Sequence, residues 1–192
     1  GWITSRWDKL QHSSQENQES KSLERVVVFL AKEDKDQALK LLLKLIRGNT
    51  LSLNLQQALG IIYRSEGFFD KAIAVHVSLL AREDIAEEMR DEVIFELAKD
   101  YICAGIFDRA RSSLALIENS NLRSQALELQ LKLSQRLRLW KESLYFLELI
   151  ENEKKIDMAM LKVHLLCELA TEGDPGALVR AKKIDPEHIR VL

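Results

Sequence analysis

Histidine, cysteine and clustered carboxylates are the side chains in this sequence whose chemistry could support catalysis or metal binding. His76 falls on the apolar stripe of a predicted helix, which favours a packed side chain. Cys103 and Cys167 lie far apart within helical patterns, so we expect buried free thiols rather than a disulfide or a metal pair. The carboxylates between residues 83 and 88 are typical of a helix start, where the helix dipole favours negative charge.

Motifs that would organise such residues into an active site are not found in the sequence. It contains no glycine-rich phosphate loop, no G-x-S-x-G and no H-E-x-x-H. His12 and His188 lie in terminal segments, and His164 is surrounded by leucine residues. We therefore predict that the protein is not an enzyme, and that these residues include no catalytic, cofactor-binding or metal-binding site.

Two helices joined by a tight turn are predicted over residues 59–80. Apolar residues recur every three or four positions on both sides of the turn at residues 65–67, which is the period of one helical face. Gly67 can adopt the left-handed conformation that ends a helix. Ala72 is small at the position where the two helices must approach each other closely.

The same pattern recurs along the chain. A second copy has Gly105 and Ala110 at the matching positions, and fainter copies place Ala38 and Ser143 at the position of Ala72. The successive intervals between these small residues are 34, 38 and 33 residues. A helix–turn–helix unit with a period of about 34 residues is the tetratricopeptide signature. We therefore predict an all-α fold in which tetratricopeptide repeats stack in a right-handed solenoid.

About five repeats are expected over residues 19–192. The last repeat is irregular, because its pattern stops early at Gly173 and only one short helix fits before Asp185. Asp174 is expected to cap that helix, with proline following at the first helical position. Asp84 is expected to cap the first helix of the third repeat, with Glu87 completing a capping box.

Residues 1–18 differ from the repeats and are predicted to be a juxtamembrane segment and linker. Trp2, Ile3 and Trp7 stand beside Arg6 and Lys9, and this mixture suits a membrane–water interface. An ordinary amphipathic terminus has the same composition, so that alternative stays open. No run of 18 apolar residues occurs in the sequence, so no complete membrane span is expected in it.

Composition narrows the class of partner. Hydrophobic residues make up 46% and charged residues 30% of the 192 residues, as in a folded globular chain. The net charge of −2 leaves no basic field to attract nucleic acid. We therefore expect protein partners, and self-association is left open.

A partner-binding groove is predicted on the first helices of the second, third and fourth repeats, because first helices line one face of such an array. Charges of both signs around one aromatic side chain resemble the rim and anchor of a protein interface. A plain solvated face is one alternative, and a Phe95 packed inside the array is another. The predicted groove residues are Asn54, Gln57, Arg64, Glu92, Phe95, Lys99, Glu128 and Lys132.

The sequence resembles the lipopolysaccharide assembly protein B family, whose members are bacterial inner-membrane tetratricopeptide proteins. The resemblance is carried by LGIIYRSEGFFDKAIAVHVSLL at 59–80, LAKDYICAGIFDRARSSL at 97–114 and HLLCELA at 164–170. It implies an adaptor on the cytoplasmic face of the inner membrane. Such an adaptor would present the deacetylase of early lipid A synthesis to the membrane protease FtsH, so that proteolysis limits lipopolysaccharide synthesis. A general interaction scaffold with an unrelated partner is the alternative.

Two features of that family have no counterpart in the sequence. One is the C-terminal zinc module with two C-x₂-C pairs, and the other is the N-terminal membrane anchor. We therefore expect these residues to be the repeat region of a longer protein.

Overall fold

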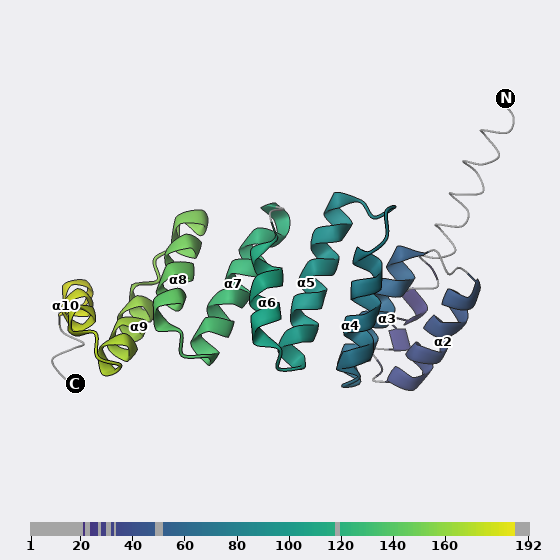
Figure 1. Cartoon of the computed structure of the whole chain (residues 1–192), viewed down its shortest axis with the longest axis horizontal. Helices are drawn as coiled ribbons and strands as arrows, with labels where there is room; N and C mark the ends of the chain where they lie inside the picture. The colour runs from purple at the N-terminus through teal and green to yellow at the C-terminus, as the bar shows by residue number, and fades with distance from the viewer. Residues whose placement is uncertain are drawn as a thin grey trace, which may run out of the picture. The chain divides into compact units, whose positions relative to one another are not determined.

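The computed structural model describes residues 21, 24–26, 28–29, 32, 34–48, 52–117 and 120–186. The predicted juxtamembrane segment and linker at residues 1–18, with Trp2 and Trp7, lies outside the described residues and stays a prediction. Every regular element in the part described is a helix (Figure 1). The prediction of an all-α fold is therefore confirmed for these residues.

The chain forms two compact units, Gly1–Gly105 and Ile106–Leu192. The first unit contains the helices α2 (Lys35–Gly48), α3 (Leu53–Ser65), α4 (Phe69–Leu80) and α5 (Glu87–Cys103). The second unit contains α6 (Phe107–Ala115), α7 (Ser120–Arg136), α8 (Trp140–Lys154), α9 (Ala159–Thr171) and α10 (Pro175–Ile184). The boundary between the units falls within the third predicted repeat.

The turns within the helix pairs share one backbone geometry. In two of these turns, the residue just before the second helix makes the same hydrogen bond back to the first helix. The amide of Phe68 donates to the carbonyl of Tyr63, and the amide of Leu139 donates to the carbonyl of Ser134, both at 2.8 Å. This bond satisfies a carbonyl that the end of the first helix leaves unpaired. In the four within-pair turns whose residues are all described, the preceding residue has a positive φ: Gly67, Gly105, Arg138 and Gly173.

The small residues at the matching positions of the repeats are buried, as the repeat pattern predicts. Ala38, Ala72, Ala110 and Ser143 are all fully buried. Around Ala38, the core of the first unit is built from leucine and isoleucine side chains of α2 and α3. The core of the second unit joins α8, α9 and α10, and it includes Leu147. Burial of these apolar faces is the main favourable term that holds the helices together.

Two expectations from the sequence are wrong. The N-cap position of α5 is occupied by Ala86, and no side chain caps the helix. Asp84 is instead drawn to Arg82, whose Nε and Nη2 donate to its two carboxylate oxygens at 2.8 and 2.6 Å. Cys103 is a free thiol as expected, but it is exposed at the last residue of α5. The cap on α10 is confirmed, since Asp174 accepts hydrogen bonds from the first amides of that helix.

Among the described residues, no helix combines the length and the apolar character needed to cross a membrane.

Candidate functional site

Arg64, near the end of α3, ties together the first helices of two successive repeats. Its Nη1 donates to the carbonyl oxygen of Glu96 at 3.1 Å and to Asp100 Oδ1 at 2.7 Å. Its Nη2 donates to Glu96 Oε2 at 2.5 Å. Both partners lie on α5, and the Arg64 side chain is only 15% exposed. A guanidinium with several fixed hydrogen bonds holds the two helices at a defined distance.

His76 on α4 holds Asp100 from its other oxygen. The Nδ1 atom of His76 lies 2.5 Å from Asp100 Oδ2, and both side chains are 0% exposed. A buried carboxylate is costly unless it is paired and hydrogen-bonded, and here an arginine and a histidine share that task. Because neither side chain reaches the surface, the pair has no access to a substrate, and its geometry supports a structural role.

Gly60 on α3 makes room for the imidazole ring. A Cβ atom at Gly60 would lie 2.6 Å from both Cε1 and Nε2 of His76, which is closer than real Cβ contacts. The Nε2 atom has no hydrogen-bond partner among the described residues. The ring is therefore positioned by Asp100 on one side and by the bare backbone of α3 on the other.

The charge network reaches the surface through Glu96 and Lys99. Lys99 Nζ lies 2.8 Å from Glu96 Oε1 and 4.4 Å from the centroid of the Phe95 ring. Burial opposes ionisation of Glu96, but the hydrogen bond from Lys99 and the charge of Arg64 outweigh it, so the pKa of Glu96 lies below its ordinary value of 4.5. Burial likewise opposes the charge on Arg64, but Glu96 and Asp100 raise its pKa. Both groups therefore stay ionised at neutral pH.

The structure separates the predicted groove residues into different environments. In the first unit, Asn54 and Glu92 are exposed, whereas Gln57 is partly buried and lies outside the network described above. Phe95 is 7% exposed, so its packing inside the array is the arrangement found, and it lies beneath Lys99 rather than open to a partner. In the second unit, Lys132 on α7 is exposed. Glu128, also on α7, pairs with Lys154 of α8.

Sequence reasoning missed the centre of the network, which is Glu96 and Asp100. A signal was present: these carboxylates follow Arg64 by 32 and 36 residues, on either side of the repeat period. Equivalent first helices lie side by side in such an array. An arginine on one of them therefore faces the two carboxylates that are one turn apart on the next.

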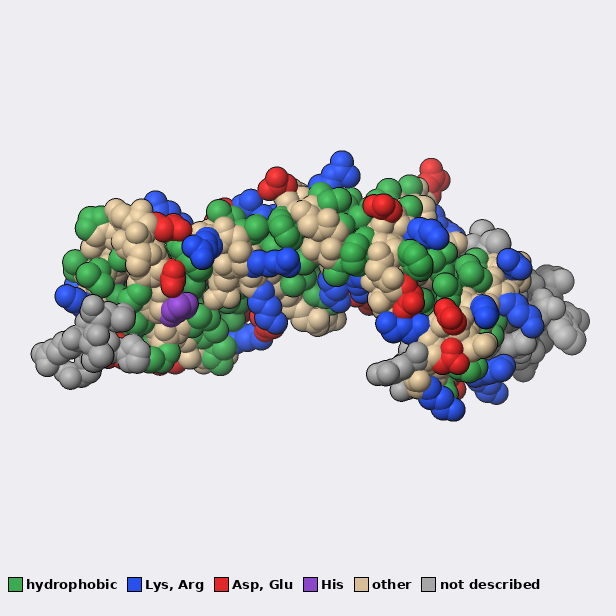
Figure 2. Space-filling model, turned by 90° about the horizontal axis from the view of Figure 1, so that it is seen from below, with side chains coloured by type: hydrophobic (Ala, Val, Ile, Leu, Met, Phe, Trp, Pro, Cys, Tyr) green, Lys and Arg blue, Asp and Glu red, His purple; other side chains and the backbone are tan. Residues whose placement is uncertain are grey.

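Neither a metal site nor a single-sign surface emerges from the part of the chain that the structure describes. No group of three or more His, Cys, Asp or Glu side chains there could hold a metal ion. Figure 2 shows side chains of both charges interspersed with apolar ones within each unit. Such a mixed surface is typical of protein recognition rather than of binding to a polyanion.

Helix pairs whose turn has a residue in the left-handed conformation, with a small buried residue in the second helix, define the tetratricopeptide class of repeat protein. Comparison with solved structures gives the same class. The crystal structure of MamA matches with a TM-score of 0.62 at 14% identity, covering 81% of this chain and 89% of that one. A tetratricopeptide repeat protein from Parabacteroides merdae matches with a TM-score of 0.60 at 16% identity, covering 89% and 75%. At these identities the likeness shows the fold alone.

In sequence, the chain is similar to lipopolysaccharide assembly protein B. The Escherichia coli K12 protein is 29% identical over 174 residues, which are 90% of this chain and 45% of the relative. The Haemophilus influenzae protein is 23% identical over 167 residues, or 82% and 42%. The resemblance inferred from the repeat motifs is confirmed, and the chain spans less than half the length of these curated relatives. A search of protein-family models found no match.

Proposed function

We propose that this chain acts as a non-enzymatic adaptor in lipopolysaccharide assembly. The observation that carries the proposal is its similarity, over 90% of its length, to proteins named lipopolysaccharide assembly protein B. The tetratricopeptide fold supports a binding role, because stacked helix pairs present extended surfaces to partner proteins.

The finer part of the proposal concerns the partners and the location. Following the family resemblance, the adaptor works at the cytoplasmic face of the inner membrane and presents the lipid A pathway deacetylase to FtsH. Such a task needs a surface that is already ordered before its client, the deacetylase, binds, because ordering side chains on binding costs affinity. The Arg64 network, which fixes α3 against α5, supplies this order in the first unit.

The residues offered to the client are the exposed polar side chains of the first helices. Asn54 and Glu92 are open to solvent in the first unit, and Lys132 is open in the second. Lys99 has a partly exposed ammonium group fixed by Glu96 and by the Phe95 ring. Phe95 therefore contributes by supporting Lys99, not by inserting into a pocket of the partner.

A retention experiment tests the proposal. The tagged chain is immobilised and mixed with solubilised membranes and cytosol of a Gram-negative bacterium, and separately with the purified deacetylase. Retention of the deacetylase or of FtsH supports the adaptor. Recovery of other proteins without either of them would favour a general scaffold with an unrelated partner.

A charge-reversal pair locates the binding surface. Lys99→Glu with Lys132→Glu is expected to lower retention of the deacetylase at least tenfold. The matched control is Lys40→Glu with Lys44→Glu, which makes the same charge change at exposed positions of the second helix α2. If both pairs retain the client equally well, the first-helix surface is not the interface. Thermal melting of each variant checks that the fold is intact.

Proximity to the membrane is tested at the N-terminus. Trp2 and Trp7 are expected to give partial flotation with anionic vesicles. Changing both to Ser should reduce the floating fraction, and equal flotation of the two proteins would make the segment an ordinary terminus.

A further inference from the structure

The second unit has a groove that the proposed function does not use. It has a volume of about 400 Å³ and lies between α8, α9 and α10. Its floor consists of the buried side chains Leu144, Leu166 and Leu169. Tyr145 stands at its edge with 59% of its surface exposed. The volume lies in the range of pockets that take a side chain or a small ligand.

The way α10 packs explains why this groove stays open. α10 packs on α9 through Ala177 and Ala181, which are both fully buried. Its larger side chains Arg180 and Ile184 are left to line the groove opposite α8. The floor is thus apolar while one wall carries a charge.

A second groove lies on the other side of α8. It has a volume of about 330 Å³ and is lined by residues of α6, α7 and α8, among them the buried Leu114 and Leu127. Tyr145 lines both grooves, so it forms the wall between them. Its ring packs edge-on against Phe146 at a centroid distance of 5.4 Å. An exposed tyrosine held in place between two apolar grooves is typical of an interface anchor.

The charges around the first groove favour an acidic ligand. Lys162 Nζ lies 3.1 Å from Glu148 Oε1, so these two charges are mutually compensated. Asp174 uses one oxygen to cap α10 and reaches Arg180 with the other only at 3.5 Å. Lys141 is exposed and forms no ion pair with any described residue. The carboxylates are therefore occupied, whereas Lys141 and most donors of Arg180 are left for an external acceptor.

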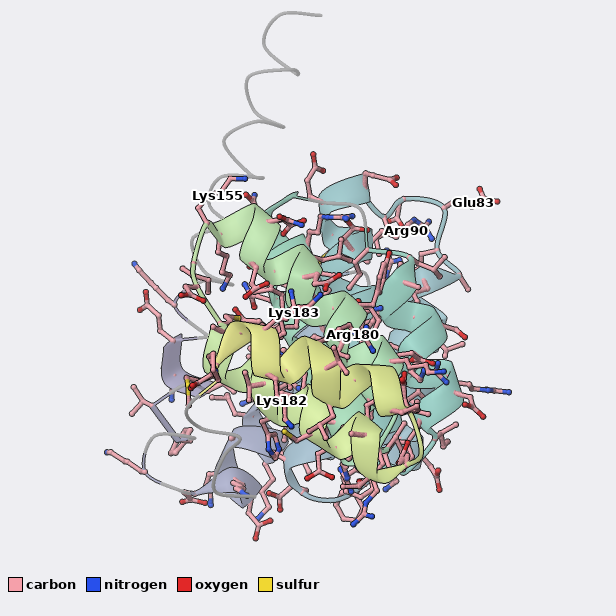
Figure 3. The ribbon with its side chains drawn as sticks, turned by 90° about the vertical axis from the view of Figure 1, so that its left-hand side faces the viewer. Glu83, Arg90, Lys155, Arg180, Lys182 and Lys183 are labelled. Atoms are coloured by element: carbon pink, nitrogen blue, oxygen red, sulfur yellow. The ribbon has the colours of Figure 1, made fainter. Side chains whose placement is uncertain are left out.

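The arrangement of cations on α10 adds to this bias and supplies a control. Figure 3 shows Arg180 and Lys183 along the edge of α10 nearer to α8, and Lys182 along the opposite edge. A charge change at Lys182 therefore alters the net charge of the same helix without touching the groove.

We propose that the two grooves flanking Tyr145 form a docking surface for a short acidic segment of a partner protein. Apolar side chains of that segment enter the grooves on either side of Tyr145, and its carboxylates pair with Lys141 and Arg180. The tested side chains Lys141 and Tyr145 lie on α8 and Arg180 lies on α10, which are second helices, whereas the client residues proposed above lie on first helices. The two proposals are therefore tested by different residues, and either can fail without the other.

Fluorescence anisotropy with labelled synthetic peptides tests the docking surface. The probe is Asp-Glu-Leu-Phe-Asp-Glu flanked by Gly-Ser, and the comparison peptides replace Leu-Phe by Ala-Ala or the acids by Lys. The acidic apolar peptide is expected to bind at least tenfold more tightly than both, with an affinity that falls as salt rises. Equal binding of the three peptides, or no binding of any, would overturn the proposal.

Variants of the full chain assign the binding to these grooves. Lys141→Glu with Arg180→Glu, and separately Tyr145→Ala, should each weaken binding of the acidic peptide at least tenfold. Lys182→Glu should leave it unchanged, and circular dichroism melting checks that each variant is folded. Wild-type affinity in the first two variants would overturn the proposal. So would concentration-dependent dimerisation in sedimentation that the peptide cannot reverse, because a second copy would then be the occupant.

Discussion

The helix pairs α3–α4 and α7–α8 have the same turn but different interiors. Both turns have a residue with positive φ, Gly67 in one and Arg138 in the other. Four residues after the small buried residue of the second helix, α4 carries His76 and α8 carries Leu147, both fully buried. One backbone design therefore accepts an imidazole or an aliphatic side chain at the same place, provided that the surroundings change with it.

The surroundings differ in how far they reach. His76 belongs to a charged network that joins α3, α4 and α5. In the other pair, the polar contact is local: the hydroxyls of Ser134 and Ser143 lie 2.8 Å apart and join only α7 to α8. Each of these hydroxyls also has a nearby backbone carbonyl as acceptor. Removing one member of the charged network should therefore lower the stability of the fold strongly, whereas removing one hydroxyl of the serine pair should lower it little.

The largest expected effect comes from Asp100→Ala, which removes the centre of the charged network. It leaves the buried His76 without a partner and takes one carboxylate from Arg64. Removing one partner of a buried pair costs about 3–5 kcal/mol, so we expect a loss of that size in the free energy of unfolding measured with urea. Asp108→Ala, at an almost fully exposed carboxylate, is the control and should cause no measurable change. A loss for Asp100→Ala as small as that of the control would contradict a cooperative network.

The second effect tests the fit between Gly60 and His76. Gly60→Ala places a Cβ against the ring and should cost about 1–3 kcal/mol, as overpacked core sites do. The cost should shrink when His76→Ala is also present, because the ring is then gone. Gly48→Ala is the control, since nothing lies within 4 Å of its Cβ position. An equal cost of Gly60→Ala with and without the ring would show that the strain lies elsewhere.

The third effect is the pH dependence that Glu96 confers. Its pKa is lowered in the folded chain, so its contribution to stability is complete above its ordinary value of 4.5 and is lost as the pH falls through the folded value. Glu96→Gln should therefore cost about 1 kcal/mol at pH 7 and progressively less below pH 4.5. Urea unfolding from pH 7 to pH 3 measures the difference. A difference that grows in acid would show that the ionised Glu96 carboxylate does not stabilise the fold.

The smallest effect is expected at the hydroxyl pair of the second unit. Ser134→Ala or Ser143→Ala should cost about 1 kcal/mol or less, because each remaining hydroxyl keeps a backbone acceptor. The free energy of unfolding of the double variant should be close to that of the more stable single variant, since no buried donor is left unpaired. A double variant that loses as much as Asp100→Ala would remove the contrast between the two helix pairs.

Part of the fold could be predicted because it depends on short-range regularities. The positive-φ position of Gly67 and the small side chain of Ala72 follow from local sterics, and the repeat spacing copies them along the chain. The same spacing gave the all-α class and the helix pairs. The cap on α10 was also predictable, since Asp174 acts on amides two and three residues away. The same local pattern wrongly predicted Asp84 as the cap of α5, because Arg82, two residues before it, binds its carboxylate.

The tertiary structure alone decided which polar side chains are buried and what they meet. His76 looked like an isolated packed histidine, but its partner Asp100 is 24 residues away on another helix. Phe95 was compatible with a groove or with the core until the packing of α5 buried it. Helical periodicity defines a face of one helix, whereas burial and pairing depend on which neighbour covers that face. The sequence therefore determined the repeating helix pair. The contacts between neighbouring helices determined which charged side chains are held by ion pairs and which remain available to a partner.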